Sequence, residues 1–184
     1  MKLPALLAAF ILTALAWALP AYAEAESGPS IALGIGNVTF TDPLTGQSED
    51  QSVVDGGFDY QLALGGAFSL NVFLGEFGAN DELKEIPNLK AFKVGHFGVQ
   101  ARVWFGALFV GAHAANYRLV TADDALSVSI SDGSQGQGLV LGYEGGSGWF
   151  VLARTDQVEG LEAPDNGPKL DVSSTRLALG FRFK

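Results

Sequence analysis

Hydrophobic and polar residues alternate with a period of two along most of the chain. In one stretch, Phe58, Tyr60 and Leu62 alternate with Asp59 and Gln61. Because successive side chains of a β-strand point to opposite faces of a sheet, this alternation predicts a strand with one apolar and one polar face. The pattern recurs often enough to predict eight strands, near residues 30–40, 58–65, 68–75, 96–103, 108–117, 137–144, 149–156 and 176–183.

Short and long connections alternate between the expected strands. The connections after the second, fourth and sixth strands are tight and contain glycine: Gly65-Gly66, Phe105-Gly106-Ala107 and Gly145-Gly146-Ser147-Gly148. The other connections are long and polar, at about residues 41–56, 78–88, 120–134 and 159–170. An even number of strands, with short turns at one end and long loops at the other, predicts an all-β fold, an eight-stranded antiparallel up-and-down transmembrane β-barrel.

Residues 1–23 have the three parts of a cleaved secretory signal peptide. Lys2 gives a positive start, residues 4–19 are almost wholly apolar, and Ala21-Tyr22-Ala23 is a small-x-small cleavage site. An uncleaved membrane anchor is the alternative, but a spanning helix needs about 20 apolar residues. We therefore expect cleavage after Ala23, and residues 24–184 then form a single barrel domain.

Composition and charge narrow the class of protein. The chain has 24 glycines in 184 residues and only 17% charged residues, below the ~25% of ordinary soluble proteins. It has no cysteine, which excludes disulfides, thiolate metal sites and a lipid anchor on an N-terminal cysteine. The formal net charge is -9, and no basic patch is present. Because nucleic-acid binding requires a positive face, we expect no nucleic-acid partner.

The polar face of the expected strands carries charges of both signs. In a membrane barrel this face lines the lumen, where opposite charges can pair, and the bulky apolar face meets lipid. The predicted lumen network consists of Asp59, His96, Arg102, His113, Glu144, Arg154, Asp156, Arg176 and Arg182. In a soluble periplasmic β-protein the same face would point to water, so that alternative remains open.

Strand direction gives each lumen residue an expected depth. With both termini at the periplasmic end, Arg102, Glu144 and Arg182 fall near that end, and the other six fall in the outer half. Eight strands enclose little more than their own side chains. We therefore expect a plugged lumen without steady conductance, with the acidic loops, including Asp50 and Asp55, facing any partner.

Aromatic residues near the strand ends are expected to form interfacial girdles: Tyr60, Trp104, Phe105, Tyr143, Trp149 and Phe183. The last strand places Leu177, Leu179, Phe181 and Phe183 on one face, and this pattern resembles the terminal signal read by the barrel-assembly machinery. In plan, residues 24–184 resemble the small outer-membrane barrels of the OmpA-transmembrane, OmpX and OmpW class. Lys184 departs from that class, which usually ends on the aromatic residue. The resemblance implies outer-membrane localisation, outer-membrane lipid contact and handling by the assembly machinery.

No catalytic or metal-binding pattern stands out. A His-x-Ser arrangement is typical of lipid A deacylases of this architecture. Neither His96 nor His113 is followed by a serine two residues later. Ser129, Ser131 and Ser174 would serve as nucleophiles only if folding brought one of them to a histidine. Two histidines without a nearby carboxylate or cysteine do not make a metal site. We therefore expect no enzyme activity, no metal and no cofactor.

These observations favour a monomeric barrel with a structural, envelope-integrity or surface-interaction role through its loops, and they do not identify the surface partner. Three other functions remain as alternatives. The barrel could be a narrow channel or small-ligand conduit, an envelope lipid hydrolase, or a soluble periplasmic β-protein.

Overall fold

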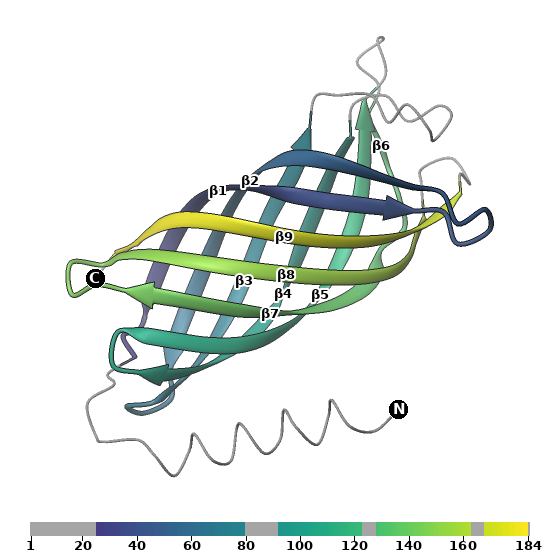
Figure 1. Ribbon diagram of the computed structural model, residues 1–184. Helices are drawn as coiled ribbons and strands as arrows, with labels where there is room; N and C mark the ends of the chain where they lie inside the picture. Colours follow the sequence, from purple (N-terminus) through teal and green to yellow (C-terminus); the bar gives the residue numbers. More distant parts are fainter. Residues whose placement is uncertain (1–24, 80–91, 123–127, 163–167, 184) are drawn as a thin grey trace.

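The computed structural model describes residues 25–79, 92–122, 128–162 and 168–183. The expected signal peptide lies outside these ranges. Eight long strands run through them: β1 (Gly28–Thr41), β2 (Ser48–Ala63), β3 (Phe68–Ala79), β4 (Phe92–Phe105), β5 (Leu108–Ala122), β7 (Ser134–Glu144), β8 (Trp149–Glu162) and β9 (Lys169–Arg182). Figure 1 shows them wound side by side into one tilted barrel. No helix in the described ranges is long and apolar enough to cross a membrane.

Every pairing between neighbouring strands is antiparallel, and the sheet closes on itself. The order runs β4-β3-β2-β1-β9-β8-β7-β5, and β4 pairs with β5 to complete the ring. The first and last long strands, β1 and β9, pair from Ser30↔Arg182 to Thr41↔Asp171. A short additional strand, β6 (Val128–Ile130), pairs with the end of β5. The structure thus confirms the predicted eight-stranded antiparallel up-and-down barrel.

Tight turns gather at one end of the barrel, which we call the turn end, and the opposite end is the loop end. The turns between β2 and β3, β4 and β5, and β7 and β8 contain Gly65, Gly106 and Gly148, with φ of 106°, 66° and 87°. Residues with a Cβ rarely adopt this left-handed backbone conformation, which explains why glycine occupies these three turn positions. Ala25 donates its N–H to Gly66 O at 3.1 Å, so the described chain also begins at the turn end.

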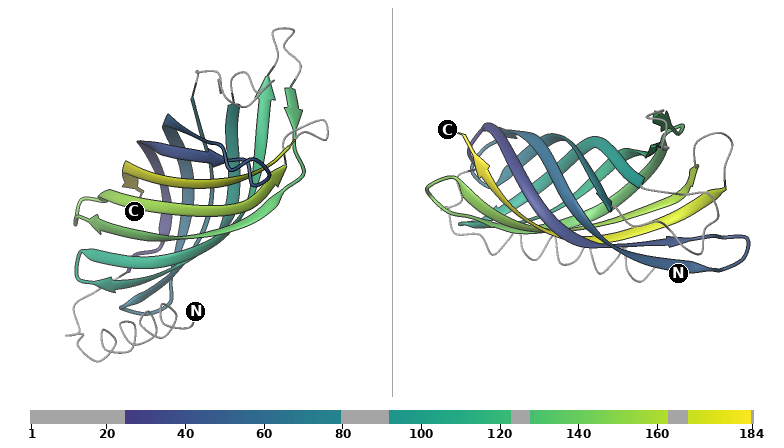
Figure 2. Two further views of the ribbon diagram at one scale, coloured as in Figure 1. Left: turned by 45° about the vertical axis from the view of Figure 1, so that its right-hand side comes forward. Right: turned by 90° about the horizontal axis from the view of Figure 1, so that it is seen from above.

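The first long connection differs from its expected extent. Residues 41–56 were expected to form a loop, but β2 begins at Ser48 and pairs with Thr41, so only residues 42–47 connect the two strands. This hairpin extends at the loop end in Figures 1 and 2. Residues 48–52 are polar on both faces, so this part of the strand lacks the alternation of apolar and polar residues that predicts a strand. Pairing with β1 along one edge nevertheless holds this segment in a strand.

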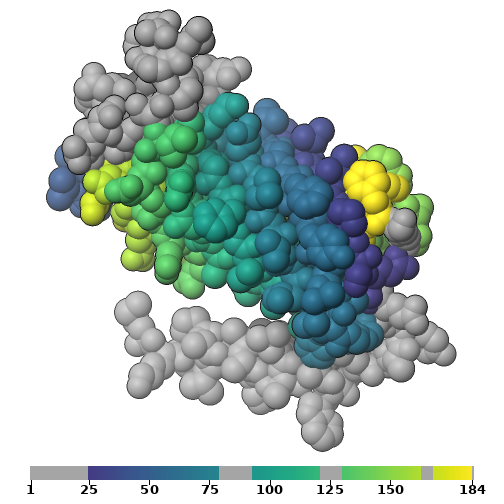
Figure 3. Space-filling model, turned by 180° about the vertical axis from the view of Figure 1, so that it is seen from behind, coloured from purple at the N-terminus to yellow at the C-terminus, as the bar shows by residue number. Residues whose placement is uncertain are grey.

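Large apolar side chains cover the outside of the turn-side half. Leu33 is 73% exposed, Val72 59% and Leu139 65%. Figure 3 views the wall where β2 to β5 (blue to green) run side by side. Because a soluble barrel buries its apolar face inside, this wall has the polarity of a barrel surrounded by lipid.

Candidate functional site

All nine residues of the predicted network point into the barrel. The eight other than Glu144 are buried, namely Asp59, His96, Arg102, His113, Arg154, Asp156, Arg176 and Arg182. The Glu144 side chain is 8% exposed. Alternation within each strand accounts for this placement, because these residues share the parity that faces away from the outer wall. The structure brings them together in two groups.

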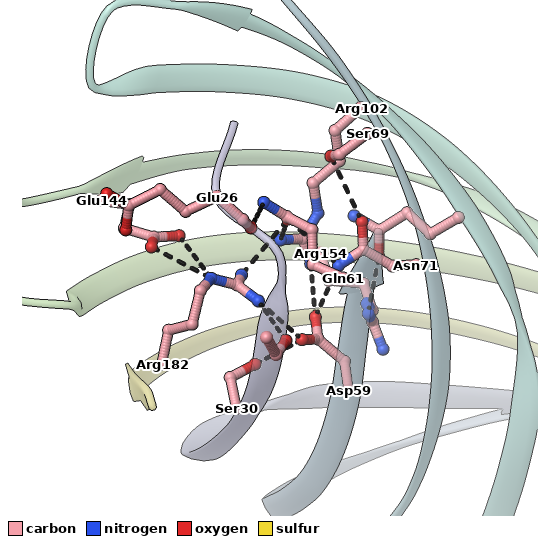
Figure 4. Close-up of polar contacts among 12 residues, drawn as sticks. Glu26, Ser30, Asp59, Gln61, Ser69, Asn71, Arg102, Glu144, Arg154 and Arg182 are labelled. Carbon is pink, nitrogen blue, oxygen red and sulfur yellow. Dashed lines mark hydrogen bonds and ion pairs between the residues drawn. The ribbon is translucent and has the colours of Figure 1, made fainter. Parts of the chain in front are cut away.

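The first group, which we call the Asp59 cluster, lies toward the turn end (Figure 4). Arg102 donates to Asp59 Oδ2 at 2.7 Å and to Gln61 Oε1 at 3.0 Å. Arg182 lies 3.5 Å from Asp59 Oδ1 and donates through Nε to Glu144 Oε1 at 3.0 Å. Two carboxylates therefore face two arginines, with the Gln61 amide oxygen shared between the cations.

Neutral side chains complete the Asp59 cluster. Ser30 donates its hydroxyl to Asp59, and Asn71 Nδ2 donates to Asp59 Oδ2 at 3.1 Å. Gln61 Nε2 donates to the carbonyl of Glu26 at 2.9 Å. The N-terminal segment is thereby tied to the turn end of the lumen. Because buried carboxylates are stable only when they are paired and hydrogen-bonded, these contacts offset the desolvation of Asp59.

The second group, the Asp156 cluster, centres on one carboxylate that accepts from four side chains. Tyr117 Oη lies 2.5 Å and His113 Nε2 lies 2.9 Å from Asp156 Oδ1. Arg176 Nη2 donates to Asp156 Oδ2 at 2.5 Å, and the Ser174 hydroxyl donates to it at 2.6 Å. His113 and Tyr117 lie on β5, and Ser174 and Arg176 lie on β9. Asp156, on β8, therefore cross-links three strands.

Asp55 is a lumen residue that the sequence reasoning missed. It was expected in the first loop, but it lies in β2, is 9% exposed and accepts from Arg176 Nη1 at 2.7 Å. With Asp55, the lumen of the described chain holds four carboxylates for its four arginines. Its parity with Asp59 was the available signal, and the assignment of residues 41–56 to a loop concealed it.

The depth predicted for Asp59 was wrong. It was expected in the outer half, apart from Arg102 and Arg182, but it pairs with both. The register explains this position, because Ser30 lies opposite Asp59 on β2 and opposite Arg182 on β9. The expected strand began at residue 58, whereas β2 runs from Ser48 to Ala63, so Asp59 lies near the turn end of its strand and not at the outer end.

Arg154 lies between the two clusters and has weaker partners. It donates to Gln100 Oε1 at 3.0 Å, and its Nη1 lies 3.5 Å from His96 Nε2. Asp55, Asp59, His96 and Arg154 line a cavity of about 40 Å³. A volume of this size holds only one or a few water molecules.

Each lumen arginine also lies over a phenylalanine ring. The guanidinium carbons of Arg102, Arg154, Arg176 and Arg182 lie 4.6, 4.4, 4.2 and 5.9 Å from the ring centroids of Phe109, Phe73, Phe77 and Phe150. Cation–π attraction in a desolvated site is worth up to about 2 kcal/mol. The rings thus support the cations while their apolar bodies fill the lumen.

Glycines make room for two of these rings. Phe109 and Phe150 lie opposite Gly142 and Gly180 on the neighbouring strands. A Cβ on Gly142 or Gly180 would collide with the facing ring. The glycine-rich composition therefore serves the packing of aromatic rings flat against the inner wall.

Trp104 was wrongly expected in an outer girdle. It is 3% exposed and points into the lumen, where its indole N–H donates to Ser69 Oγ at 2.9 Å. Trp104 lies two residues after Arg102 on the same strand, so both side chains point to the same face, into the lumen. Tyr60, Tyr143, Trp149 and Phe183 are about half exposed on the outer wall, where the girdle was expected.

The polarity of the barrel reverses toward the loop end. There the interior is an apolar core that includes Val38, Phe40, Phe77, Leu119, Val158, Leu161, Leu170 and Val172. On the same strands the outward residues are polar, as with Thr39 and Gln157. The loop-side half of the barrel therefore has the polarity of a water-soluble barrel, with an apolar core inside.

The histidines are not arranged for nucleophilic catalysis. Ser174 and His113 both contact Asp156, so the carboxylate separates the hydroxyl from the imidazole. A nucleophilic serine must instead donate to the base itself. Both residues are also buried. Within the described ranges, no group of three His, Cys, Asp or Glu side chains is placed to hold a metal ion.

The residues of the expected assembly signal lie on the outer face of β9. Leu177, Leu179 and Phe183 are 55%, 54% and 46% exposed, and Phe181 is partly exposed. Phe181 contacts the rings of Trp149 and Phe183 at 5.2 and 5.3 Å between centroids. Recognition of this strand by the assembly machinery stays a prediction.

Closed antiparallel topology, a charged interior and an apolar outer wall together define the fold of small eight-stranded outer-membrane β-barrels. Neisserial surface protein A has a similar structure, with a TM-score of 0.59 and 15% sequence identity over 87% of this chain and 100% of that one. Ail, the attachment invasion locus protein of Yersinia pestis, is also similar, with a TM-score of 0.53 and 12% identity over 86% of this chain and all of its own. A second Ail structure, in complex with the heparin analogue sucrose octasulfate, has a TM-score of 0.51. The sequence matches no protein-family profile and no curated protein.

Proposed function

We propose that this protein is a monomeric outer-membrane barrel with a closed lumen, which acts as a structural and surface-interaction element of the cell envelope. The observation that supports a closed lumen is the arrangement of side chains along the barrel interior. Two charge clusters and their aromatic rings occupy the turn-side half, and an apolar core occupies the loop-side half. A channel would need a connected column of water through both halves.

The outer wall supports membrane placement over a soluble periplasmic location. Side chains such as Leu33, Leu74 and Leu139 are each more than half exposed, and such residues recur around the turn-side half. A soluble monomer rarely exposes so much contiguous apolar surface. Lipid contact removes this surface from water while the charges stay paired inside.

The closed lumen predicts a negative result in planar bilayers. Purified protein should give no stable conductance steps at neutral pH, because the apolar core leaves no hydrated path even if an ion pair opens. The matched control is a variant that weakens the core, Phe40→Ser with Leu170→Ser. Stable single-sized steps from the wild-type protein would refute the closed-lumen proposal and favour the channel alternative.

Membrane placement is tested separately by fractionation and gel mobility. The folded protein should sediment with outer membranes and migrate differently before and after boiling. Recovery in the soluble periplasmic fraction, with no heat-dependent mobility, would favour a soluble β-protein. A hydrolase would be revealed by fatty-acid release from lipid A or phospholipid, and we expect none because Ser174 does not contact an imidazole.

A further inference from the structure

The outer wall formed by β7, β8, β9 and β1 changes character partway along the strands. These strands run side by side on the near wall in Figure 1. Strand register arranges their outward residues in rows. One row, Leu141, Ala153, Leu177 and Ile35, is entirely apolar. Apart from Leu139, the next two rows toward the loop end contain the residues that we call the amide–hydroxyl wall: Asn37, Thr39, Gln137, Thr155, Gln157, Ser173 and Thr175.

This change fixes where hydrocarbon can end on that side. Amide side chains such as Asn37 and Gln157 are costly in hydrocarbon, where they find no partner. The lipid-facing stretch of β8 therefore runs only from Trp149 to Ala153, whereas that of β2 runs from Val54 to Leu62. At about 3.3 Å per residue and ~40° tilt, the β8 stretch spans roughly 10–15 Å, against about 25 Å for a usual apolar band. The head groups of the outer leaflet should therefore lie against the amide–hydroxyl wall.

The wall is hollowed and carries no charge. A groove of about 410 Å³ is lined by Asn37, Thr39, Thr155, Gln157, Ser173 and Thr175, and also by Asp156 and Ser174, whose side chains pair inside the barrel. A second hollow of about 890 Å³ shares Gln157 and continues past Gln137 toward β4 and β5. The nearest ionised groups are acidic. Asp50 on β2 accepts from the Thr39 hydroxyl at 2.6 Å, and Glu159 and Asp171 lie further toward the loop end.

We propose that the amide–hydroxyl wall binds the uncharged sugars of glycolipids in the outer leaflet of the same membrane, an inference that rests on the proposed outer-membrane placement. Sugar hydroxyls donate and accept hydrogen bonds, and Gln, Asn, Thr and Ser side chains do both. The acidic rim disfavours phosphate-bearing head groups. The wall begins one row above Leu177 and Ile35. Acyl chains can thus pack on the apolar row while the sugars of the same lipid reach the groove.

The test compares two lipids with identical acyl chains, digalactosyl diacylglycerol and phosphatidylcholine. The full chain, folded in detergent micelles with equal amounts of both lipids, is examined by native mass spectrometry for retained lipid. The wild-type protein should retain the digalactosyl lipid preferentially. Gln157→Ala with Ser173→Ala, at the centre of the wall, should reduce that preference about tenfold, the effect of losing roughly two ordinary hydrogen bonds.

The matched control removes two polar residues from the far wall. Glu76 and Lys93 form an exposed salt bridge at 3.1 Å between β3 and β4, and Glu76→Ala with Lys93→Ala should leave the preference unchanged. Equal retention of both lipids by the wild type would overturn the proposal. So would an unchanged preference in the Gln157 variant, equally strong binding of free digalactose, or a wild-type dimer that this variant abolishes.

Heat-modifiable mobility, measured on every variant, separates the two proposals. A folded, membrane-inserted wild type without glycolipid preference counts against the sugar-binding wall alone. A wild type that does not insert overturns the membrane placement and this inference together.

Discussion

The Asp156 carboxylate offers the sharpest test of the lumen network. Asp156→Ala removes the shared acceptor of Tyr117, His113, Ser174 and Arg176. Removing one partner of a buried ion pair costs about 3–5 kcal/mol, and each stranded buried hydroxyl costs about 1–3 kcal/mol. Arg176 keeps Asp55 at 2.7 Å, which reduces the first cost. Together these effects predict a loss of about 4 kcal/mol in the free energy of unfolding.

Urea unfolding of the folded barrel in liposomes measures this loss, with tryptophan fluorescence as the readout. Trp104 is buried in the lumen, so its emission should change when the barrel opens. For a slope near 2 kcal/mol/M, the midpoint of Asp156→Ala should fall by roughly 2 M. Asp156→Asn keeps the shape and one acceptor oxygen but removes the charge. Its urea midpoint should therefore lie between those of the wild type and Asp156→Ala.

The matched control is Asp50→Ala in β2. Asp50 is exposed and accepts one hydrogen bond from Thr39 at 2.6 Å, and a surface change of this kind alters stability by about 0.5 kcal/mol or less. If Asp156→Ala unfolds within about 1 kcal/mol of the wild type, as Asp50→Ala should, the clustered donors do not stabilise the barrel and the reasoning is wrong.

Three further predictions follow from other contacts. Asp59→Ala should destabilise the barrel more than Glu144→Ala in the same urea assay, because Asp59 contacts two arginines and Glu144 only one; the reverse order would contradict the geometry. Gly142→Val should cost about 1–3 kcal/mol by overpacking, and Phe109→Leu should recover part of that cost in a double-mutant cycle, whereas strictly additive costs would refute the contact. The Leu44 N–H and the Thr45 hydroxyl hold the pKa of Asp42 below its usual 3.8. The stabilisation of this loop is therefore present above pH 3.8 and is lost as pH falls through the lowered pKa, and an NMR titration giving 3.8 or more would exclude it.

The sequence determined the strands and the direction of their side chains. Period-two alternation assigned Arg102, Asp156 and Arg176 to one face, because strand geometry is local. Alternating tight turns and loops then predicted the closed antiparallel topology. The errors arose where a local rule was misapplied or its signal was weak. Trp104 was assigned to the outer wall although its position in the alternation places it on the inner face. Asp55 was assigned to a loop because residues 48–52 are polar on both faces.

Only the tertiary structure decided which charges meet and how the barrel divides along its axis. Stagger between tilted strands brings Asp59 to Arg182 through their shared neighbour Ser30, and no single strand contains that information. The reversal of polarity has the same origin. Val172 and Gln157 become core and surface of a water-facing half only because closure sets the inner and outer faces of every strand at once. Side-chain alternation is a property of each strand, whereas the stagger that sets depth and partners arises only when eight strands close into one barrel.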